Sequence, residues 1–301
     1  MLGKDRAARW PSRGLVMGKN DQGRHHAPSP QGVQLRIGDI EIYPIADGTF
    51  RASPGYFGDH ATAEGHEDYF IRDGKAWLPI GCFLIRTRSR RVLVDAGLGP
   101  AMRDDGDRRL LIGGQLPVGR RAAGVSPDDV DAVICTHLHA DHCGWLFDLV
   151  GAPVFPSARL WFGAADWEHF VLDPRVWMFD HIRYGLRNID GSRMHLVTQD
   201  TTVVPGVDVM MTPGHTPGHL SVVVSSGSHR ALLLGDAIVC PLQLDEPTWQ
   251  SMGDVDPALA ARVRERLFRE LAQENTEGVG AHFPELRFGR VMEGRGRTWI
   301  T

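Results

Sequence analysis

The segment CTHLHADHCGW, residues 135–145, constrains this chain more than any other, because it places His137, His139, Asp141 and His142 within six positions. Such side chains are costly to bury unless they are paired or bind a metal ion. These four residues come shortly after the apolar run VDAVIC, which indicates a strand that ends inside the fold. One histidine would suggest an ordinary polar loop. Four ligand-type residues instead favour a borderline divalent cation such as zinc.

Three other places repeat the arrangement of an apolar strand, a turn and a ligand-type residue. His215 follows VDVMMTPG, Asp236 ends the run RALLLGD, and His282 follows the short run GVGA. A buried carboxylate such as Asp236 requires a cation or hydrogen-bond donors. Each position alone is weak support for a metal site, but together they predict ligands gathered at the carboxyl ends of several strands.

Alternating apolar and polar residues predict many short strands. VQLRIGDIEIYPIADG indicates two strands around the turn at Gly38-Asp39, and CFLIRTRSRRVLVDAG indicates two more. Further strands are expected in VDAVIC, ARLWFG, RMHLVT, VDVMM, LSVVVSS and RALLL. Helices are expected after Ser126, which precedes a proline and two acids, and after Asp256, where Leu259, Val263, Leu267 and Leu271 form one apolar stripe. This pattern favours an α/β layered domain.

The chain divides into a tail and one domain. Residues 1–31 are rich in Arg, Gly, Pro and Ser and are expected to form a flexible N-terminal tail, with Met1 or Met17 as the true start. Residues 32–301 are long enough for one domain. Within it, residues 50–80 have aromatic side chains without a period, which favours a lid, a dimerisation arm or a well-packed loop.

Composition argues against several classes of partner. The 33 basic and 37 acidic residues nearly cancel, so we expect neither nucleic acid nor an anionic membrane as a partner. We find no apolar run of the roughly 20 residues that a membrane span needs. The four cysteines lack CxxC spacing, and the N-terminal residues do not resemble a secretory signal. A cytoplasmic protein with buried thiols is the expectation.

The segment THLHADH resembles the HxHxDH signature of the metallo-β-lactamase superfamily, and His215, Asp236 and His282 follow in the order of that family. The resemblance spans residues 33–297 and implies a four-layer αββα sandwich with two metal ions at one edge. The C-terminal part resembles the branch of methyl parathion hydrolase and the quorum-quenching lactonases, whose members are often homodimers.

The resemblance also implies a role for each ligand. His137, His139 and His215 would hold one metal ion, and Asp141, His142 and His282 the other, with Asp236 between them. Asp95, in VLVDAG, would orient a ligand histidine, and Asp47 would do the same or form a turn with Gly48. His219 is expected to be a turn residue or to support a ligand, and Cys143 and Cys240 to be packing residues.

Two metal ions, most simply Zn²⁺ with Mn²⁺ or Fe²⁺ as alternatives, suggest hydrolysis by a bridging hydroxide. Asp141 or Asp236 would receive or relay the proton. The implied substrate is a small, fairly apolar ester, lactone or organophosphate. A tyrosine that some acyl-homoserine lactonases carry after the bridging aspartate is missing here, where Ala237 to Cys240 follow. A glutathione-linked thioesterase or an iron-dependent dioxygenase is the alternative, and a nuclease is less favoured.

Overall fold

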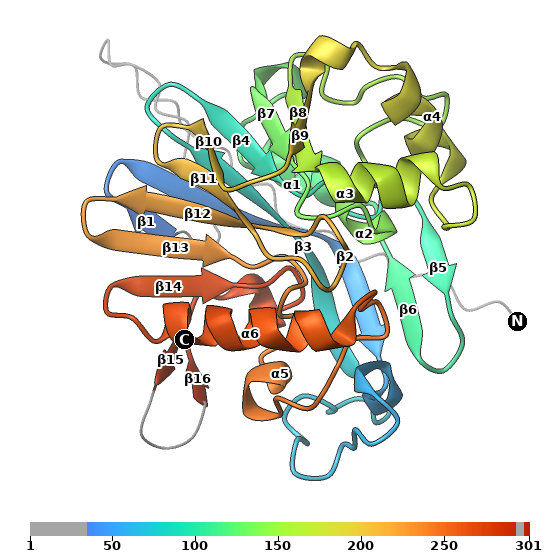
Figure 1. The fold of residues 1–301 in the computed structure, drawn as a ribbon, viewed down its shortest axis with the longest axis vertical. Coiled ribbons are helices and arrows are strands. Elements are labelled where there is room, and N and C mark those ends of the chain that lie inside the picture. The colour runs from blue at the N-terminus through green and yellow to red at the C-terminus, as the bar shows by residue number, and fades with distance from the viewer. Residues whose placement is uncertain (1–34, 293–297) are drawn as a thin grey trace, which may run out of the picture.

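Two β-sheets packed face to face form the centre of the protein (Figure 1). The computed structural model describes residues 35–292 and 298–301, so the expected tail of residues 1–31 lies outside the described part. The larger sheet has the order β5-β6-β2-β3-β4-β7-β8-β9, with β1 beside β2, and the smaller sheet has the order β10-β11-β12-β13-β14. The strands of the larger sheet are β1 (Leu35–Ile37), β2 (Ile40–Ala52), β3 (Ala76–Arg86), β4 (Arg91–Val94), β5 (Met102–Asp104), β6 (Arg109–Ile112), β7 (Ala132–Ile134), β8 (Arg159–Gly163) and β9 (Met194–Val197). Those of the smaller sheet are β10 (Thr201–Val204), β11 (Val207–Met211), β12 (Leu220–Ser226), β13 (His229–Leu233) and β14 (Thr276–Val279), and β15 (Arg290–Met292) pairs with β16 (Thr298–Ile300).

Helices cover the outer faces of both sheets, so the predicted αββα sandwich is confirmed. Side chains of α1 (Leu116–Ala122) and α4 (Asp180–Asn188) pack on the larger sheet. The longest helix, α6 (Pro257–Leu271), lies along β14, where Gly278 leaves room for the Leu271 side chain. The remaining helices, α2 (Ala140–Cys143), α3 (Ala164–Asp166) and α5 (Leu242–Asp245), are short.

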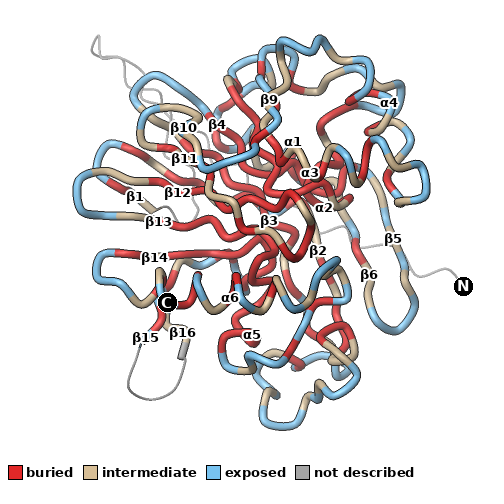
Figure 2. Tube along the Cα trace, viewed as in Figure 1, coloured by how far each residue is buried: buried red, intermediate tan, exposed pale blue. Residues whose placement is uncertain are grey.

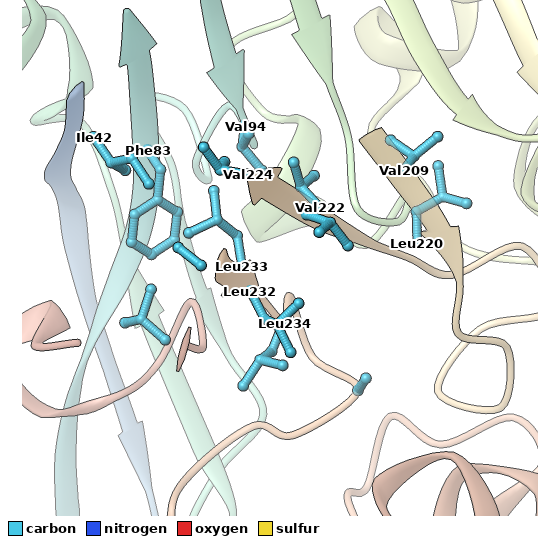
Figure 3. Packing of buried hydrophobic residues seen from close by; sticks show 14 of the residues in the cluster. Ile42, Phe83, Val94, Val209, Leu220, Val222, Val224, Leu232, Leu233 and Leu234 are labelled. Carbon is cyan, nitrogen blue, oxygen red and sulfur yellow. The ribbon is translucent and has the colours of Figure 1, made fainter. Parts of the chain in front are cut away.

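The central strands are apolar at almost every position because both of their faces are buried. In β3, Phe83 and Ile85 face the smaller sheet, whereas Cys82 and Leu84 face the outer helices. Figure 3 shows the packing of Phe83 and Ile42 near the smaller-sheet residues Val222 and Leu233. Figure 2 shows buried segments at the centre of the protein and exposed loops at the rim.

Most of the expected elements are confirmed, and one expectation is wrong. Each apolar run that predicted a strand contains one, and α6 buries Val263, Leu267 and Leu271. The helix expected after Ser126 is only a 3₁₀ turn, Pro127–Asp129, because the chain enters β7 three residues later. The capping interaction between Ser126 and Asp129 is nevertheless present.

The loop expected over residues 50–80 is shorter, because β2 continues to Ala52 and β3 begins at Ala76. The connection, residues 53–75, packs against the segment that precedes α6. Phe57 stacks on Trp249, and the Gln250 amide donates a 3.0 Å hydrogen bond to the Phe57 carbonyl oxygen. These contacts are those of a well-packed loop, while a role as a lid or dimerisation arm stays a prediction. Within the described residues, no helix is both long and apolar enough to cross a membrane.

Candidate metal centre

The seven ligand-type residues come together because four strands end at one edge of the two sheets. Strands β11 and β13 each pair antiparallel with β12, so they run in the same direction, and β14 is parallel to β13. His215, Asp236 and His282 follow the carboxyl ends of β11, β13 and β14. The segment from His137 to His142 follows β7 of the larger sheet. The centre therefore joins loops from both sheets.

A turn and a short helix after β7 bring the ligand-type residues of this segment together. Strand β7 ends at Ile134, so His137 and His139 lie beyond the strand and strand alternation does not align them. His139 instead caps α2, which carries Asp141 and His142. Gly144, which follows this helix, has ordinary helical dihedral angles. It is needed for space, because a Cβ atom there would lie 2.1 Å from the Leu98 carbonyl oxygen.

Three imidazoles, which we call the His137 group, point ring nitrogens at one another. His139 Nδ1 lies 3.0 Å from His137 Nε2 and 3.0 Å from His215 Nε2. Tetrahedral zinc with Zn–N bonds of about 2.0–2.1 Å would place such nitrogens only slightly farther apart. These residues are the three that the resemblance assigned to one metal ion.

Asp141, His142 and His282, the His282 group, form a second cluster beside the first. Asp141 Oδ2 lies 3.5 Å from His282 Nε2 and 3.9 Å from His142 Nε2. Asp236 stands between the clusters. Its Oδ1 lies 3.4 Å from both His142 Nε2 and His282 Nε2, and its Oδ2 lies 3.6 Å from His215 Nε2. One carboxylate thus faces both groups, as expected for a bridging ligand.

Hydrogen bonds outside the centre set the tautomers of these histidines. His282 Nδ1 donates to the Pro79 carbonyl oxygen at 2.7 Å, and His215 Nδ1 lies 2.9 Å from Asp254 Oδ1. A carbonyl or carboxylate oxygen can only accept, so each Nδ1 carries the proton. In the neutral form of each ring, Nε2 therefore presents a lone pair to the centre, which is the state that binds a metal ion.

Asp95 fixes one histidine directly and another through Thr136. Its Oδ2 lies 2.9 Å from His142 Nδ1 and accepts from the Thr136 hydroxyl at 2.9 Å. Since that hydroxyl has a single proton, its contact with His137 Nδ1 at 3.1 Å makes His137 the donor. The expectation that Asp95 orients a histidine agrees with this geometry. Asp95 also reaches a residue of each group.

The donor set fits a pair of divalent cations. His142 Nε2 and Asp236 Oδ1 are buried, and neither has a hydrogen-bond partner. Leaving such atoms unpaired costs about 1–3 kcal/mol each, more for a charged group. Imidazole nitrogens and carboxylate oxygens are the ligands that zinc, manganese and ferrous iron accept. A cation held by each group, with Asp236 shared, would give these atoms partners.

The electrostatics of the two groups differ. Burial and neighbouring rings hold the pKa of His137 and His139 well below the usual value, so both rings are neutral. Burial also opposes charge on His142, but Asp236, Asp95 and Asp141 raise its pKa well above the usual value. Carboxylates therefore concentrate around the His282 group, where a cation would replace the proton.

The other candidate residues lie near the centre without facing it. His219 Nε2 accepts the Asp236 amide at 3.0 Å, and its Nδ1 lies 2.8 Å from the Thr212 hydroxyl. It therefore supports Asp236, as expected. Cys143 donates to the His139 carbonyl oxygen, and Cys240 is buried. Burial raises the pKa of both thiols, to about 12 for Cys240, which agrees with the expected packing role.

Asp47 neither orients a ligand nor forms a turn, so both expectations for it are wrong. It lies within β2, next to an irregularity in the pairing with β3. Its carboxylate accepts from five donors, namely the amides of Leu98, Gly99, Gly114 and Leu116 and the Trp145 indole. It ties together three loops behind the metal centre.

Two supporting aspartates escaped the sequence reading. Asp166 accepts from the Leu138 amide, the Thr216 hydroxyl and the Gly218 amide, so it joins the two histidine-bearing loops. Burial raises its pKa to about 6. Asp254 pairs with His215 and with Arg264 at 3.2 Å. Asp166 lies three residues after the apolar strand β8, the same pattern that marked Asp236, whereas Asp254 lies in an irregular loop that no pattern marks.

A cavity of about 330 Å³ opens beside the centre, with His139 and Asp141 in its wall. Phe170 and Trp177, two of the aromatic residues near the ligand loops, also line it. Gly253 lies in the wall against the His137 group, where a Cβ atom would come within 2.8 Å of His215 Cε1. The volume lies at the low end of the range for small-molecule sites.

Thr136→Val tests the hydroxyl that links Asp95 to His137. We expect the affinity of the His137 group for its metal ion to fall about tenfold, as for other groups that orient ligands. The measurement is a competition titration with a metal chelator. Thr202→Val is the matched control, because its hydroxyl also donates to an aspartate, Asp208, but touches no residue of the centre. Equal affinities in both variants would contradict the assigned role of Thr136.

Comparisons with known proteins find relatives of this chain. The family model of the metallo-beta-lactamase superfamily matches residues 76–275. An N-acyl homoserine lactonase of Bacillus thuringiensis is 28% identical over 173 residues, which cover 52% of this chain and 62% of that relative. Metallo-beta-lactamase domain-containing protein 1 of Mus musculus is 30% identical over 200 residues, which cover 66% of each chain. The chain thus spans less than two thirds of the length of the lactonases it matches.

Solved structures share the fold. AidC, described as a dizinc quorum-quenching lactonase, superimposes with a TM-score of 0.76 at 21% identity, over 89% of this chain and 96% of that one. A probable metal-dependent hydrolase from Staphylococcus aureus gives a TM-score of 0.76 at 20% identity, over 88% and 98%. At sequence identities this low, the similarity shows a shared fold and nothing more.

Proposed function

This chain belongs to the metallo-beta-lactamase superfamily, and from that premise we propose that it is a dinuclear metal-dependent hydrolase of a small ester, lactone or organophosphate. The observation that carries the proposal is the position of Asp236, whose two oxygens face one histidine-rich group each. A mononuclear centre would not need a second set of ligands. Lactonases among the relatives favour the lactone and ester classes.

The proposed ligands are those named from the sequence. His137, His139 and His215 would hold one cation, and Asp141, His142 and His282 the other, with Asp236 shared. Zinc is the preferred cation, since most of the ligands are imidazoles, and Mn²⁺ or Fe²⁺ would also suit them. Two such cations would supply a water acidified to a hydroxide nucleophile and would polarise the scissile carbonyl or phosphoryl oxygen.

Asp141 is the better placed of the two carboxylates to move a proton. It lines the cavity together with His139, whereas Asp236 is not among the cavity residues. Asp141 can therefore meet the nucleophile or the leaving group on the substrate side. Asp236 would instead act as the ligand shared by the two cations. The short distances between its oxygens and three imidazoles support that role.

The alternatives have less support. A glutathione-linked thioesterase or an iron-dependent dioxygenase could use a similar ligand set, so these remain the second proposal. A nuclease would need cationic side chains free to follow a phosphate backbone. On α6, Arg264 pairs with the buried Asp254, and Arg266 donates to the Met211 carbonyl oxygen. Two of the arginines on α6 are therefore already paired within the protein.

A substrate panel with defined metals tests the proposal. The metal-free protein is loaded with zinc, manganese or iron and assayed against lactones, aryl esters, thioesters and organophosphates. We expect hydrolysis of an ester or lactone and close to two metal equivalents per chain by elemental analysis. A metal content near one iron ion per chain, together with consumption of oxygen during the reaction, would support the dioxygenase instead. The absence of hydrolysis with all three metals would contradict the proposal.

The working compartment and assembly are part of the same proposal. We propose a cytoplasmic enzyme of one domain over residues 32–301, supported by four free, buried cysteines. Its partner is a small molecule, and a homodimer is proposed from the resemblance alone. Sedimentation of the metal-loaded protein measures the oligomeric state.

A further inference from the structure

Two arginines line the cavity beside the metal centre, and the metal ligands do not account for them. Arg103 and Arg109 share the cavity with His139 and Asp141. They come from the hairpin of β5 and β6, at the end of the larger sheet (Figure 1). Asp47 holds the base of this hairpin through the Gly114 amide. The hairpin thus brings two positively charged arginine side chains to the place where a substrate would lie.

One carboxylate positions both guanidinium groups. Arg103 Nε lies 3.1 Å from Asp105 Oδ2, and Arg109 contacts the same oxygen through Nε at 2.8 Å and through Nη2. Arg103 also stacks on the Trp177 ring, with Cζ 4.0 Å from the ring centroid. These contacts use the Nε side of Arg103. Among residues 35–292 and 298–301, no protein acceptor bonds either Nη atom of Arg103 or Nη1 of Arg109.

The hairpin side of the wall therefore carries excess positive charge. Its two guanidinium groups share the single Asp105 carboxylate, because the other carboxylate of the cavity, Asp141, belongs to the proposed metal ligands. An arginine keeps its charge at any physiological pH. Burial disfavours the charged form of Arg109, but Tyr56, Asp141 and Asp105 raise its pKa overall. Free guanidinium N–H groups bind carboxylate or phosphate oxygens strongly, because the hydrogen bonds are charge-assisted.

We propose that the substrate carries an anionic group, a carboxylate or a phosphate, which Arg103 and Arg109 bind while the scissile ester or lactone bond lies over the metal centre. This inference rests on the proposed function and narrows its substrate class. An N-acyl homoserine lactone carries no charge and would leave both guanidinium groups without an anion. Phe170 and Trp177 would contact the apolar part of the substrate.

Three esters with one leaving group test the inference. The 4-nitrophenyl esters of butyric, succinic and 3-phosphonopropionic acid end in a methyl group, a carboxylate and a phosphonate. We expect the zinc-loaded enzyme to favour at least one anionic ester over the butyrate by about tenfold in kcat/KM, equivalent to one charge-assisted hydrogen bond. The comparison of carboxylate with phosphonate identifies the anion.

Variants assign the preference to the hairpin. Arg103→Gln and Arg109→Gln should each lower the ratio of anionic to neutral kcat/KM about tenfold, through a rise in KM for the anionic ester. Arg108→Gln is the matched control, since that exposed side chain lies 3.6 Å from Asp59 and lines a different cavity. Equal kcat/KM for the three esters in the unmodified enzyme would overturn the inference, as would a preference that survives both variants.

A binding measurement separates this inference from the proposed function. Trp177 stacks on Arg103, so its fluorescence should respond to glutarate or methylphosphonate, and the response should be lost in Arg103→Gln. Saturable binding without hydrolysis of any ester would contradict the proposed hydrolase and support the anion site. Hydrolysis of the butyrate without anion binding would contradict the anion site alone.

Discussion

Asp236→Ala is expected to abolish hydrolysis while leaving the fold largely intact. Its carboxylate is the one group that faces both histidine-rich clusters, so its removal takes a ligand from each proposed metal ion. Losing the several kcal/mol that a metal ion contributes to transition-state stabilisation corresponds to about a thousandfold or more in rate. The measurements are kcat/KM, bound metal and the far-ultraviolet circular dichroism spectrum. His142→Ala should behave similarly.

Asp245→Ala is the control for this experiment, because its side chain lies on an exposed position at the end of α5. It should keep both its activity and its metal. Activity retained by Asp236→Ala or His142→Ala, with normal folding, would contradict the roles assigned to these residues. A loss shared by Asp245→Ala would show that the effect is not specific to the centre.

Asp47→Ala is expected to give the largest loss of stability, roughly 3–5 kcal/mol in the free energy of unfolding. Five donors lose their acceptor at once, and they belong to three loops that are otherwise separate in sequence. Denaturant titration of the zinc-loaded protein at fixed metal concentration measures the change. Because the β5–β6 hairpin is held by the same carboxylate, the preference for anionic esters should also weaken.

Asp39→Ala is the matched control for Asp47→Ala. Asp39 is an exposed aspartate of the turn before β2 and pairs with Arg88 on the surface. Exposed pairs of this kind contribute about 0–1 kcal/mol. A similar midpoint shift in the two variants would show that Asp47 does not hold the loops as described.

The proposed ligands could be named from the sequence because each has a specific residue type and follows an apolar strand. His215, Asp236 and His282 lie far apart in the chain, yet strand direction brings them to one edge. Asp254 could not be found this way, since it acts by contacting a ligand from an irregular loop. Its partner Arg264 resembled an ordinary charge on the solvated face of a helix.

Short sequence motifs predicted the local contacts correctly, but not the length of the element that follows them. The capping pair Ser126–Asp129 forms as its spacing indicates, but it says nothing of how soon a strand follows. The β5–β6 hairpin was missed because MRDDGDRRLLI has charges where an apolar alternation would be expected. Those charges include Arg103 and Arg109, which face the cavity. The charged residues that obscured the hairpin in the sequence are therefore the ones to which we assign a function.

The position of the centre between the two sheets has a consequence for how the protein matures. With metal bound, each sheet would be fastened to the other by coordination bonds as well as by side-chain packing. Cations that bind only the native state would then stabilise it against unfolding. The melting temperature should rise with the logarithm of the free metal concentration. Metal supply during synthesis would set how long a newly made chain resists unfolding.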